Sequence, residues 1–324
     1  MTHDSTPRIG YFLGSITGGM RDGALRWKDI AEIARYAEEV GFDSFWVPDH
    51  LLFRFEGQAS HAPWEGWSII SALAASTTRI GIGSLVVCTA FRNPGLLAKM
   101  ADTVDEISGG RFTLGLGAGW HEPEYAAFGY PSGNRIDRFE EAVSILRTLL
   151  RTGHIDHQGR YYELRDCELR PRGPRAEGPP ILIGALASRP RMLRLAATYA
   201  DIWNGWLVAG RSYADQGASL QGAADAACTE VGRDPRTLER TVGVLIDQRP
   251  ADARPSRQYA SLSTVSLENE QQPLIGTPEE IAAELRRFAD AGFSQVQISA
   301  ALDGMAGVEA MAPVLELLRG RNGR

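Results

Sequence analysis

The sequence predicts a single (β/α)8 barrel of the TIM type, and three observations lead to that prediction. Short apolar runs alternate with longer amphipathic segments along the chain, the rhythm of a parallel sheet whose strands are joined by helices. Eight such pairs are present, the number that closes a barrel. The length of 324 residues suits one barrel with insertions, and no composition shift marks a boundary. We therefore expect residues 1–324 to form one domain.

The predicted strands are the apolar runs at 9–12, 44–47, 80–87, 112–116, 181–183, 201–204, 242–246 and 295–298. The helices predicted to follow them span 27–40, 64–75, 96–107, 137–150, 191–199, 213–231, 278–291 and 308–318. The first helix shows the reasoning, because its apolar residues recur at helical spacing and form one face: Ile30, Ile33, Ala34, Ala37 and Val40. Gly41 then stands where a helix commonly ends.

The competing architecture is an open, doubly wound sheet, which requires an early dinucleotide-binding fingerprint. The glycines at 115, 117 and 119 resemble one superficially. Trp120, however, occupies the position of the third glycine, and Glu122-Pro123 is expected to interrupt the helix that would bind a pyrophosphate. The sequence therefore favours the closed barrel.

Three segments are longer than a bare barrel needs. Residues 51–63 form a long loop after the second strand, 153–180 begin with a predicted hairpin at 154–163, and 247–277 are polar and irregular. Long loops inside a compact domain are usually functional. Because 51–63 and 247–277 follow strands, we expect both insertions on the C-terminal face, where barrel active sites lie.

Composition excludes several classes of function. The 34 Lys and Arg against 40 Asp and Glu give a net charge of −6, which argues against a nucleic-acid partner. No run approaches the roughly 18 apolar residues of a membrane span. The first eight residues are polar, so we expect a cytoplasmic protein. Cys88, Cys167 and Cys228 are widely spaced, which predicts reduced thiols rather than disulfides or a zinc site.

The residue types at the C-terminal ends of the predicted strands indicate an enzyme that uses a bound cofactor. The first strand has no His-x-His pair for a metal, so we expect no metal site. The chain also lacks a Gly-x-Ser-x-Gly elbow and a lysine at any strand end. A histidine, aromatic residues, amides and glycines remain there, and these residue types need a bound cofactor for difficult chemistry.

Several ordered motifs carry a family resemblance. They are the runs GFDSFWVPDH at 41–50, FRNP at 91–94, SGGRF at 108–112, LGLGAGWHE at 114–122, GRYY at 159–162, PPILIG at 179–184 and YADIWN at 199–204. Together they resemble the bacterial luciferase-like superfamily and, within it, the coenzyme F420-dependent oxidoreductases. The resemblance covers about residues 8–245 and the last two helices, and leaves 247–277 unmatched.

The resemblance implies roles at two strand ends. His50 is expected beside the deazaflavin ring, as an acid/base or as a stabiliser of the charge that changes on hydride transfer; the alternative is a histidine that only caps the strand. Asp49 would bind the cofactor ring or orient His50, and its alternative is capping of loop N–H groups. Ser84, Leu85 and Val86 would support the ring through a cis peptide bond between Leu85 and Val86.

The remaining cofactor contacts come from three further segments. Trp120 and Glu124 are expected to contact the ring and its side chain, although Trp120 is as well explained by packing under the loop. Small residues and a following helix N-terminus suit a phosphate loop, and Asn204 and Gly205 would close the same pocket. That loop contains Gly184, Ala185 and Leu186, with Ser188 as a possible N-cap.

The sequence thus predicts an F420-dependent oxidoreductase that moves a hydride between the deazaflavin and a small organic substrate. Two alternatives stay open: a monooxygenase that takes reduced FMN from a separate reductase, and a barrel that stores a flavin without turnover. In the sugar-phosphate dehydrogenases of the superfamily, the position of Trp120 is acidic, so we do not expect sugar-phosphate oxidation. The resemblance also implies a homo-oligomer. His61, His154 and His157 are expected on the solvated surface.

Overall fold

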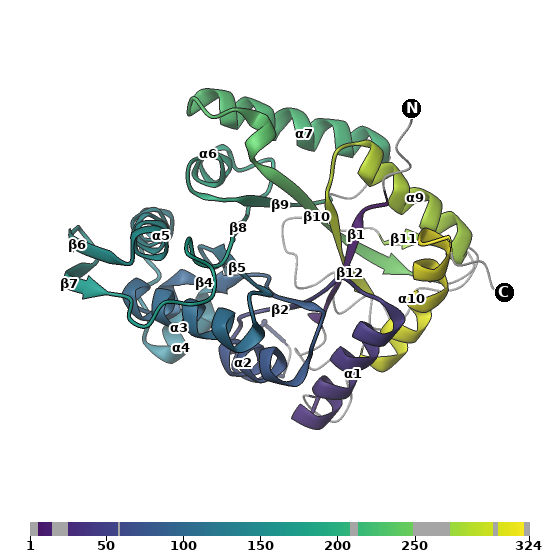
Figure 1. Ribbon diagram of the computed structural model, residues 1–324, viewed down its shortest axis with the longest axis horizontal. Coiled ribbons are helices and arrows are strands. Elements are labelled where there is room, and N and C mark those ends of the chain that lie inside the picture. Colours follow the sequence, from purple (N-terminus) through teal and green to yellow (C-terminus); the bar gives the residue numbers. More distant parts are fainter. Residues whose placement is uncertain are drawn as a thin grey trace.

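The computed structural model describes residues 6–14, 25–57, 59–207, 213–248, 273–300 and 304–320. Eight parallel strands form a closed barrel, which confirms the predicted fold class (Figure 1). The barrel closes because β1 pairs with both β2 and β12, while β9 pairs with both β8 and β10. The strands are β1 (Arg8–Phe12), β2 (Ser44–Val47), β3 (Gly81–Ser84), β5 (Phe112–Gly117), β8 (Ile181–Gly184), β9 (Ile202–Trp206), β10 (Glu239–Asp247) and β12 (Gln295–Ala300).

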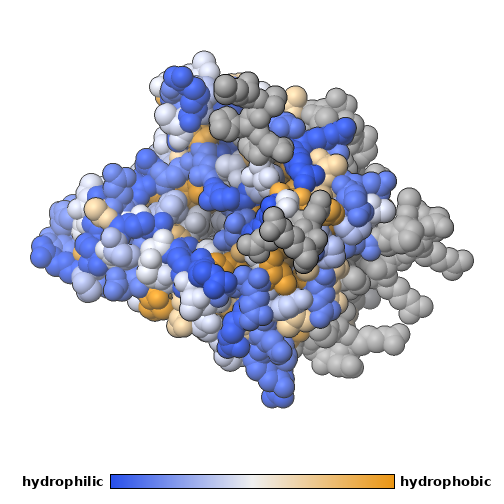
Figure 2. Space-filling view, turned by 45° about the vertical axis from the view of Figure 1, so that its right-hand side comes forward, coloured by the Kyte–Doolittle hydropathy of each residue, from blue (hydrophilic) through white to orange (hydrophobic). Residues whose placement is uncertain are grey.

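Helices surround the strands, and every predicted helix is present within a few residues of its expected bounds (Figure 1). They are α1 (Trp27–Val40), α2 (Gly66–Ser76), α3 (Pro94–Ser108), α5 (Arg135–Thr152), α6 (Pro190–Tyr199), α7 (Tyr213–Glu230), α9 (Pro278–Asp290) and α10 (Met305–Leu318). The apolar face of α1 is buried, and Gly41 ends the helix with a φ of 102°. In Figure 2, hydrophilic residues cover most of the visible surface and hydrophobic residues gather toward its middle.

Two local features differ from the predicted pattern. The apolar run at 80–87 is not one strand: β3 ends at Ser84, a cis peptide bond joins Leu85 to Val86, and β4 (Val87–Cys88) then pairs with β5. The cis bond confirms the expectation from the family resemblance. Pro123 does not interrupt a helix but lies in the first turn of a short one, α4 (Glu122–Phe128), where the missing proline N–H is tolerated.

The segment 153–180 contains the expected hairpin, formed by β6 (His154–Gln158) and β7 (Glu163–Glu168). The hairpin lies at the edge of the molecule beside α5 (Figure 1). It follows α5 and therefore begins at the end of the barrel opposite the C-terminal face. Its turn folds back along α5, because the backbone N–H groups of Arg160, Tyr161 and Tyr162 all donate to the Glu141 carboxylate.

The predicted insertion at 247–277 falls mostly outside the described residues, which resume at Pro273. One element of it is described: β11 (Leu274–Ile275) pairs in parallel with the end of β10, a short strand that the sequence analysis did not predict. Among the described residues, no helix is both long and apolar enough to cross a membrane.

Arg111, in the motif at 108–112, fastens helix ends to the barrel. Its guanidinium donates five hydrogen bonds, to acceptors on Ala74, Thr77, Ile80 and Ser108. Three of these bonds go to Ala74 and Thr77 at the C-terminal end of α2, where carbonyl groups lack helical partners. A single side chain therefore joins α2, the end of α3 and the start of β3.

The barrel interior is filled by a few large side chains that lie against glycines. A Cβ on Gly10 would lie 2.5 Å from the indole Nε1 of Trp46, and one on Gly243 would lie 2.6 Å from the Trp206 ring. Trp46 is buried within a cluster with Leu85, Leu182 and Ile202, and the half-buried Phe12, Val86 and Trp206 pack against that cluster. These half-buried side chains form a floor at the C-terminal ends of β1, β3 and β9.

Candidate active site

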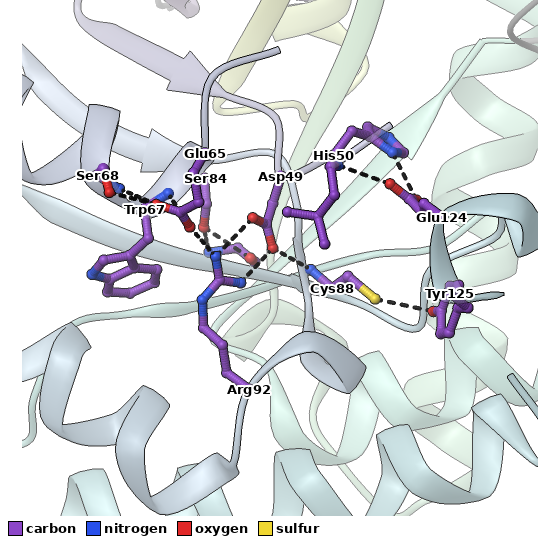
Figure 3. Close-up of polar contacts among 12 residues, drawn as sticks. Asp49, His50, Glu65, Trp67, Ser68, Ser84, Cys88, Arg92, Glu124 and Tyr125 are labelled. Carbon is purple, nitrogen blue, oxygen red and sulfur yellow. Dashed lines mark hydrogen bonds and ion pairs between the residues drawn. The ribbon is translucent and has the colours of Figure 1, made fainter. Parts of the chain in front are cut away.

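The end of β2 supplies two polar side chains that point in different directions (Figure 3). His50 is 20% exposed, and its Nδ1 lies 3.0 Å from Glu124 Oε1. The other oxygen of Glu124 accepts a hydrogen bond from the backbone N–H of Leu51 at 2.9 Å. Glu124 lies in the first turn of α4 and is 1% exposed, so its carboxylate is held behind the imidazole.

This contact favours one tautomer of the neutral imidazole. A carboxylate in its ionised form only accepts hydrogen bonds, and toward such a partner the hydrogen belongs to His50 Nδ1. In the neutral ring, the lone pair is then on Nε2, which is the nitrogen left to accept or return a proton. Glu124 had been expected to contact the cofactor, but the structure places its carboxylate on His50 and Leu51.

Asp49 does not orient His50; its carboxylate is bound to Arg92 and to the backbone N–H of Cys88 (Figure 3). Arg92 Nη1 and Nη2 donate to the two oxygens at 2.7 and 2.9 Å, and Nη2 also donates to Glu65. Burial disfavours the charged guanidinium, but the bonds to Asp49 and the two carboxylate charges outweigh it and raise the pKa of Arg92. The alternative of backbone capping is therefore the role that the contacts support.

The segment after β3 forms one wall of the mouth. Ser84 is fully buried, and its hydroxyl donates to the Gly115 carbonyl and accepts from the Gly115 N–H, both at 2.8 Å. Val86 lies over two glycines: a Cβ on Gly117 would lie 2.5 Å from its Cγ2, and a Cβ on Gly184 would lie 3.3 Å from its Cγ1. The two glycines leave the space that Val86 occupies, while Leu85 packs into the interior cluster.

Aromatic rings form a second wall in the loops after β2 and β5, the strands on either side of β3. Trp120 is 40% exposed and meets His50 edge to face, with ring centroids 5.7 Å apart. The buried Phe53 packs behind both, 4.5 Å from His50 and 6.3 Å from Trp120. His61 is half-buried and stacked on Phe53 at 5.3 Å, so the expectation of a solvated surface position was wrong for it. His154 is exposed as expected, whereas His157 is half-buried, with its Nε2 3.3 Å from a Glu141 oxygen.

His121 belongs to the same wall and was not identified as a site residue from the sequence. It is 4% exposed, and its Nε2 accepts a hydrogen bond from the backbone N–H of Arg54 at 3.1 Å. Burial lowers the pKa of His121; the nearby His50 and His61 lower it further, and Glu124 opposes them. The neutral imidazole thus joins the loop after β2 to the loop after β5.

The expected phosphate loop lies between β8 and α6. Residues of β9 hold its backbone in place. The Ala185 N–H donates to the Asn204 carbonyl at 3.0 Å, and the Trp203 indole donates to the Ala185 carbonyl at 2.9 Å. Ser188 is not the N-cap: Arg189 holds that position without a side-chain cap hydrogen bond, and Pro190 occupies the first turn. Gly184 and Leu186 are both partly exposed at this edge of the barrel.

Asn204 supports the loop through its backbone rather than its side chain. The Asn204 side chain is fully buried inside the barrel, where its amide donates to Thr241 and Gln297, both at 2.9 Å. Gly205 faces outward, because a Cβ there would lie 3.1 Å from the Trp203 ring. The contact between Asn204 and the loop is made by its carbonyl group.

The thiols are free, as expected, and they offer no nucleophile at the site. Cys88 is buried next to Tyr125, with its Sγ 3.0 Å from the phenol oxygen. Burial raises the pKa of Cys88 to about 12, so the group stays a thiol at neutral pH. Within the described ranges, no group of three His, Cys, Asp or Glu side chains is placed to hold a metal ion.

Sequence reasoning missed Arg92, Phe53 and His121 as parts of the site. Arg92 stands in the motif at 91–94, but nothing in the spacing shows that it pairs with Asp49, 43 residues earlier. Phe53 and His121 lie next to recognised positions, in loops without periodicity. Tertiary contact, rather than local pattern, brings these residues together.

Solved structures of known proteins share the fold. An F420-dependent secondary alcohol dehydrogenase in complex with an F420–acetone adduct superposes with a TM-score of 0.77, at 22% identity over 97% of this chain and 100% of that one. The EDTA monooxygenase EmoA from Chelativorans sp. BNC1 gives a TM-score of 0.76, at 16% identity over 98% of this chain and 94% of that one.

Similarity in sequence is higher to two other proteins. The F420-dependent glucose-6-phosphate dehydrogenase of Amycolatopsis mediterranei is 29% identical over 81% of this chain and 77% of that protein. The pyrimidine monooxygenase RutA of Rhizobium rhizogenes is 36% identical over 52% of this chain and 47% of that protein, so the match spans about half of each. Residues 8–263 match the family model for luciferase-like monooxygenases. The chain therefore belongs to the luciferase-like monooxygenase family and is an enzyme of that family.

Proposed function

We propose that the protein is an F420-dependent oxidoreductase that transfers a hydride between the deazaflavin and a small organic substrate. The observation that carries the proposal is the imidazole of His50, partly exposed at the barrel rim and held by a buried carboxylate. The 29% identity to an F420-dependent dehydrogenase supports the choice of cofactor. A cytoplasmic location and a homo-oligomeric state are part of the same proposal and rest on the family resemblance.

The residues at the rim fit a tricyclic cofactor with a phosphorylated tail. Phe12, Val86 and Trp206 are half-buried apolar side chains, a suitable surface for a flat ring. The loop Gly184 to Ala187 is built of small residues and one leucine, and the N-terminus of α6 after it lacks a side-chain cap hydrogen bond. Helix amides of this kind bind phosphate oxygens. The tail would therefore lie over this loop and the ring beside His50.

In this arrangement, the protein's own residues position the reactants and handle a proton. The deazaflavin, when bound, supplies the ring carbon that gives or takes the hydride. His50 Nε2 would accept the proton released as a substrate carbon is oxidised, or return it in the reverse direction. Glu124 holds the imidazole in this tautomer, and Val86 and Trp120 limit where the two reacting molecules can lie.

The second candidate is a monooxygenase that uses reduced FMN from a separate reductase. It is favoured by the similarity to the pyrimidine monooxygenase RutA. Over the segment that this match covers, the identity is 36%, compared with 29% for the match to the F420-dependent dehydrogenase. The same floor and loop suit FMN, whose tail also ends in a phosphate. His50 and Glu124 would again be the groups that hold a proton next to the ring.

Titration of the purified protein with F420 and, separately, with FMN tests the choice. Binding is read from quenching of tryptophan fluorescence, since Trp120 is exposed at the rim. We expect tighter binding of F420, and loss of F420-linked turnover in a His50→Ala variant that still binds the cofactor. Micromolar affinity for FMN without a response to F420 would favour the monooxygenase. Unchanged turnover in the His50→Ala variant would show that the imidazole is not part of the catalytic machinery.

A further inference from the structure

A pocket lies beside Arg92, among segments that follow or join the barrel strands. Its volume is about 270 Å³. Four segments line it: residues 90–93 in the turn before α3, Tyr130 and Pro131 after α4, Arg138 of α5, and Tyr162 in the hairpin turn. Of the described residues that line it, only Arg92 also belongs to the candidate active site, where it binds Asp49.

The polar groups of this pocket are donors of hydrogen bonds. Arg138 donates through Nε to the Gly133 carbonyl and lies 4.4 Å from the ring centroid of Tyr161, and it forms no ion pair within the described part of the chain. Burial raises the pKa of Tyr162, so its phenol keeps its proton. Asn93 already uses its carbonyl oxygen to cap the Gly95 N–H at 2.9 Å, which leaves its amide N–H groups. No carboxylate is among the described residues that line the pocket.

Its apolar part includes aromatic rings. Phe91 packs edge to face on Tyr125, with ring centroids 5.2 Å apart, and against Tyr130 at 5.0 Å, so its position is held by other rings. Ala90 and Pro131 add apolar surface. A volume of about 270 Å³ is near the low end for ligand pockets, large enough for one ring with a substituent and too small for a dinucleotide.

We propose that this pocket binds a small carboxylate with a flat apolar body, such as an aromatic acid. The guanidinium of Arg138 would bind the carboxylate, because its planar fork matches the two oxygens of that group. Tyr162 and Asn93 would donate further hydrogen bonds, and the ring would lie against Phe91. Arg92 contributes little charge, since it is neutralised by Asp49 and Glu65.

The test uses benzoate as the probe and benzamide as its neutral counterpart, with isothermal titration calorimetry on the full chain. Each titration is run on the protein alone and again in the presence of excess F420 and of excess FMN. We expect saturable benzoate binding that persists with either cofactor, and binding of benzamide at least about tenfold weaker, because the charged contact is lost. The outcome does not depend on which cofactor the enzyme uses.

Two variants and a matched control locate the site. We expect benzoate affinity to fall by about tenfold or more in Arg138→Gln and by a smaller factor in Tyr162→Phe. Arg160→Gln is the control, because Arg160 also lies near the Tyr161 ring, at 5.1 Å, but does not line the pocket. If Arg138→Gln does not fold, as judged by its thermal unfolding, Tyr162→Phe and the benzamide comparison decide.

Four results would overturn the proposal. They are the absence of saturable benzoate binding at about 10 mM, equal affinity for benzamide, displacement of benzoate by a cofactor, and equal losses in Arg160→Gln and Arg138→Gln. Displacement by a cofactor would place the carboxylate in the barrel mouth. None of these results would bear on the proposed role of His50.

Discussion

Replacing Glu124 with glutamine tests whether this buried carboxylate controls His50. The two oxygens of Glu124 accept hydrogen bonds from His50 Nδ1 and from the Leu51 N–H, at 3.0 and 2.9 Å. A glutamine has nearly the same shape but only one acceptor oxygen. One of the two donors would therefore face an amide N–H2 group in a buried position.

The expected cost follows from that count. A hydrogen bond to a charged group contributes about 1.5–3 kcal/mol, and one such bond is lost while the other loses its charge assistance. If about 2–3 kcal/mol of this cost falls on the productive orientation of the imidazole, turnover decreases by about 30- to 150-fold. Cofactor affinity should change little, because the Glu124 carboxylate is turned toward His50 and Leu51.

Steady-state turnover and cofactor titration on the same preparation give the two readings. Glu122→Gln is the matched control: Glu122 lies two residues earlier in the first turn of α4, carries the same charge and is exposed. Unchanged turnover in Glu124→Gln would refute the reasoning, as would an equal loss in the control. A loss of cofactor affinity without a loss of turnover at saturation would show instead that Glu124 is a cofactor ligand.

Three further changes have expected outcomes. Arg111→Lys should lower the free energy of unfolding, measured in urea, by at least about 3 kcal/mol, because an ammonium group has three donors in place of the five that the guanidinium uses. A loss no larger than that from changing an exposed arginine to lysine would contradict this. Gly117→Ala should weaken cofactor binding by displacing Val86, at a stability cost of about 1–3 kcal/mol, whereas Gly133→Ala, which has open space, should change neither reading. The pKa of His121 is lowered in the folded protein, so as the pH falls the unfolded chain binds a proton at this residue before the folded protein does. The free energy of unfolding should therefore decrease below about pH 6.5. His121→Asn should make this decrease smaller, as measured by urea unfolding at several pH values.

The fold was predictable because each element depends on local pattern. The bounds of α1 and β2 were predicted to the residue, since periodic apolar residues and Gly41 mark them. The cis peptide bond that ends β3 could not be recognised from the apolar run at 80–87, and it was expected only from the family resemblance. The helix α4 was missed because Pro123 was taken as a breaker, although a proline is well tolerated in a first turn.

The site was predictable only in part, because its pairs come from distant segments. His50 and Glu124 were both named from the sequence, but their contact joins residues 74 positions apart. Asp49 was expected to bind the cofactor ring or to orient the neighbouring His50, but its carboxylate accepts hydrogen bonds from Arg92. Neighbouring residues after a strand point to different sides, and no local pattern shows which partner each side chain meets.

The way the barrel is filled has a consequence for altering its specificity. Trp46 and Trp206 occupy the space that the facing glycines, Gly10 and Gly243, leave open. A smaller residue at position 206 would deepen the recess under a bound molecule without moving any strand. In the proposed binding mode, the indoles at positions 46 and 206 therefore set the depth of this recess from below, as the loops at the entrance limit it from above.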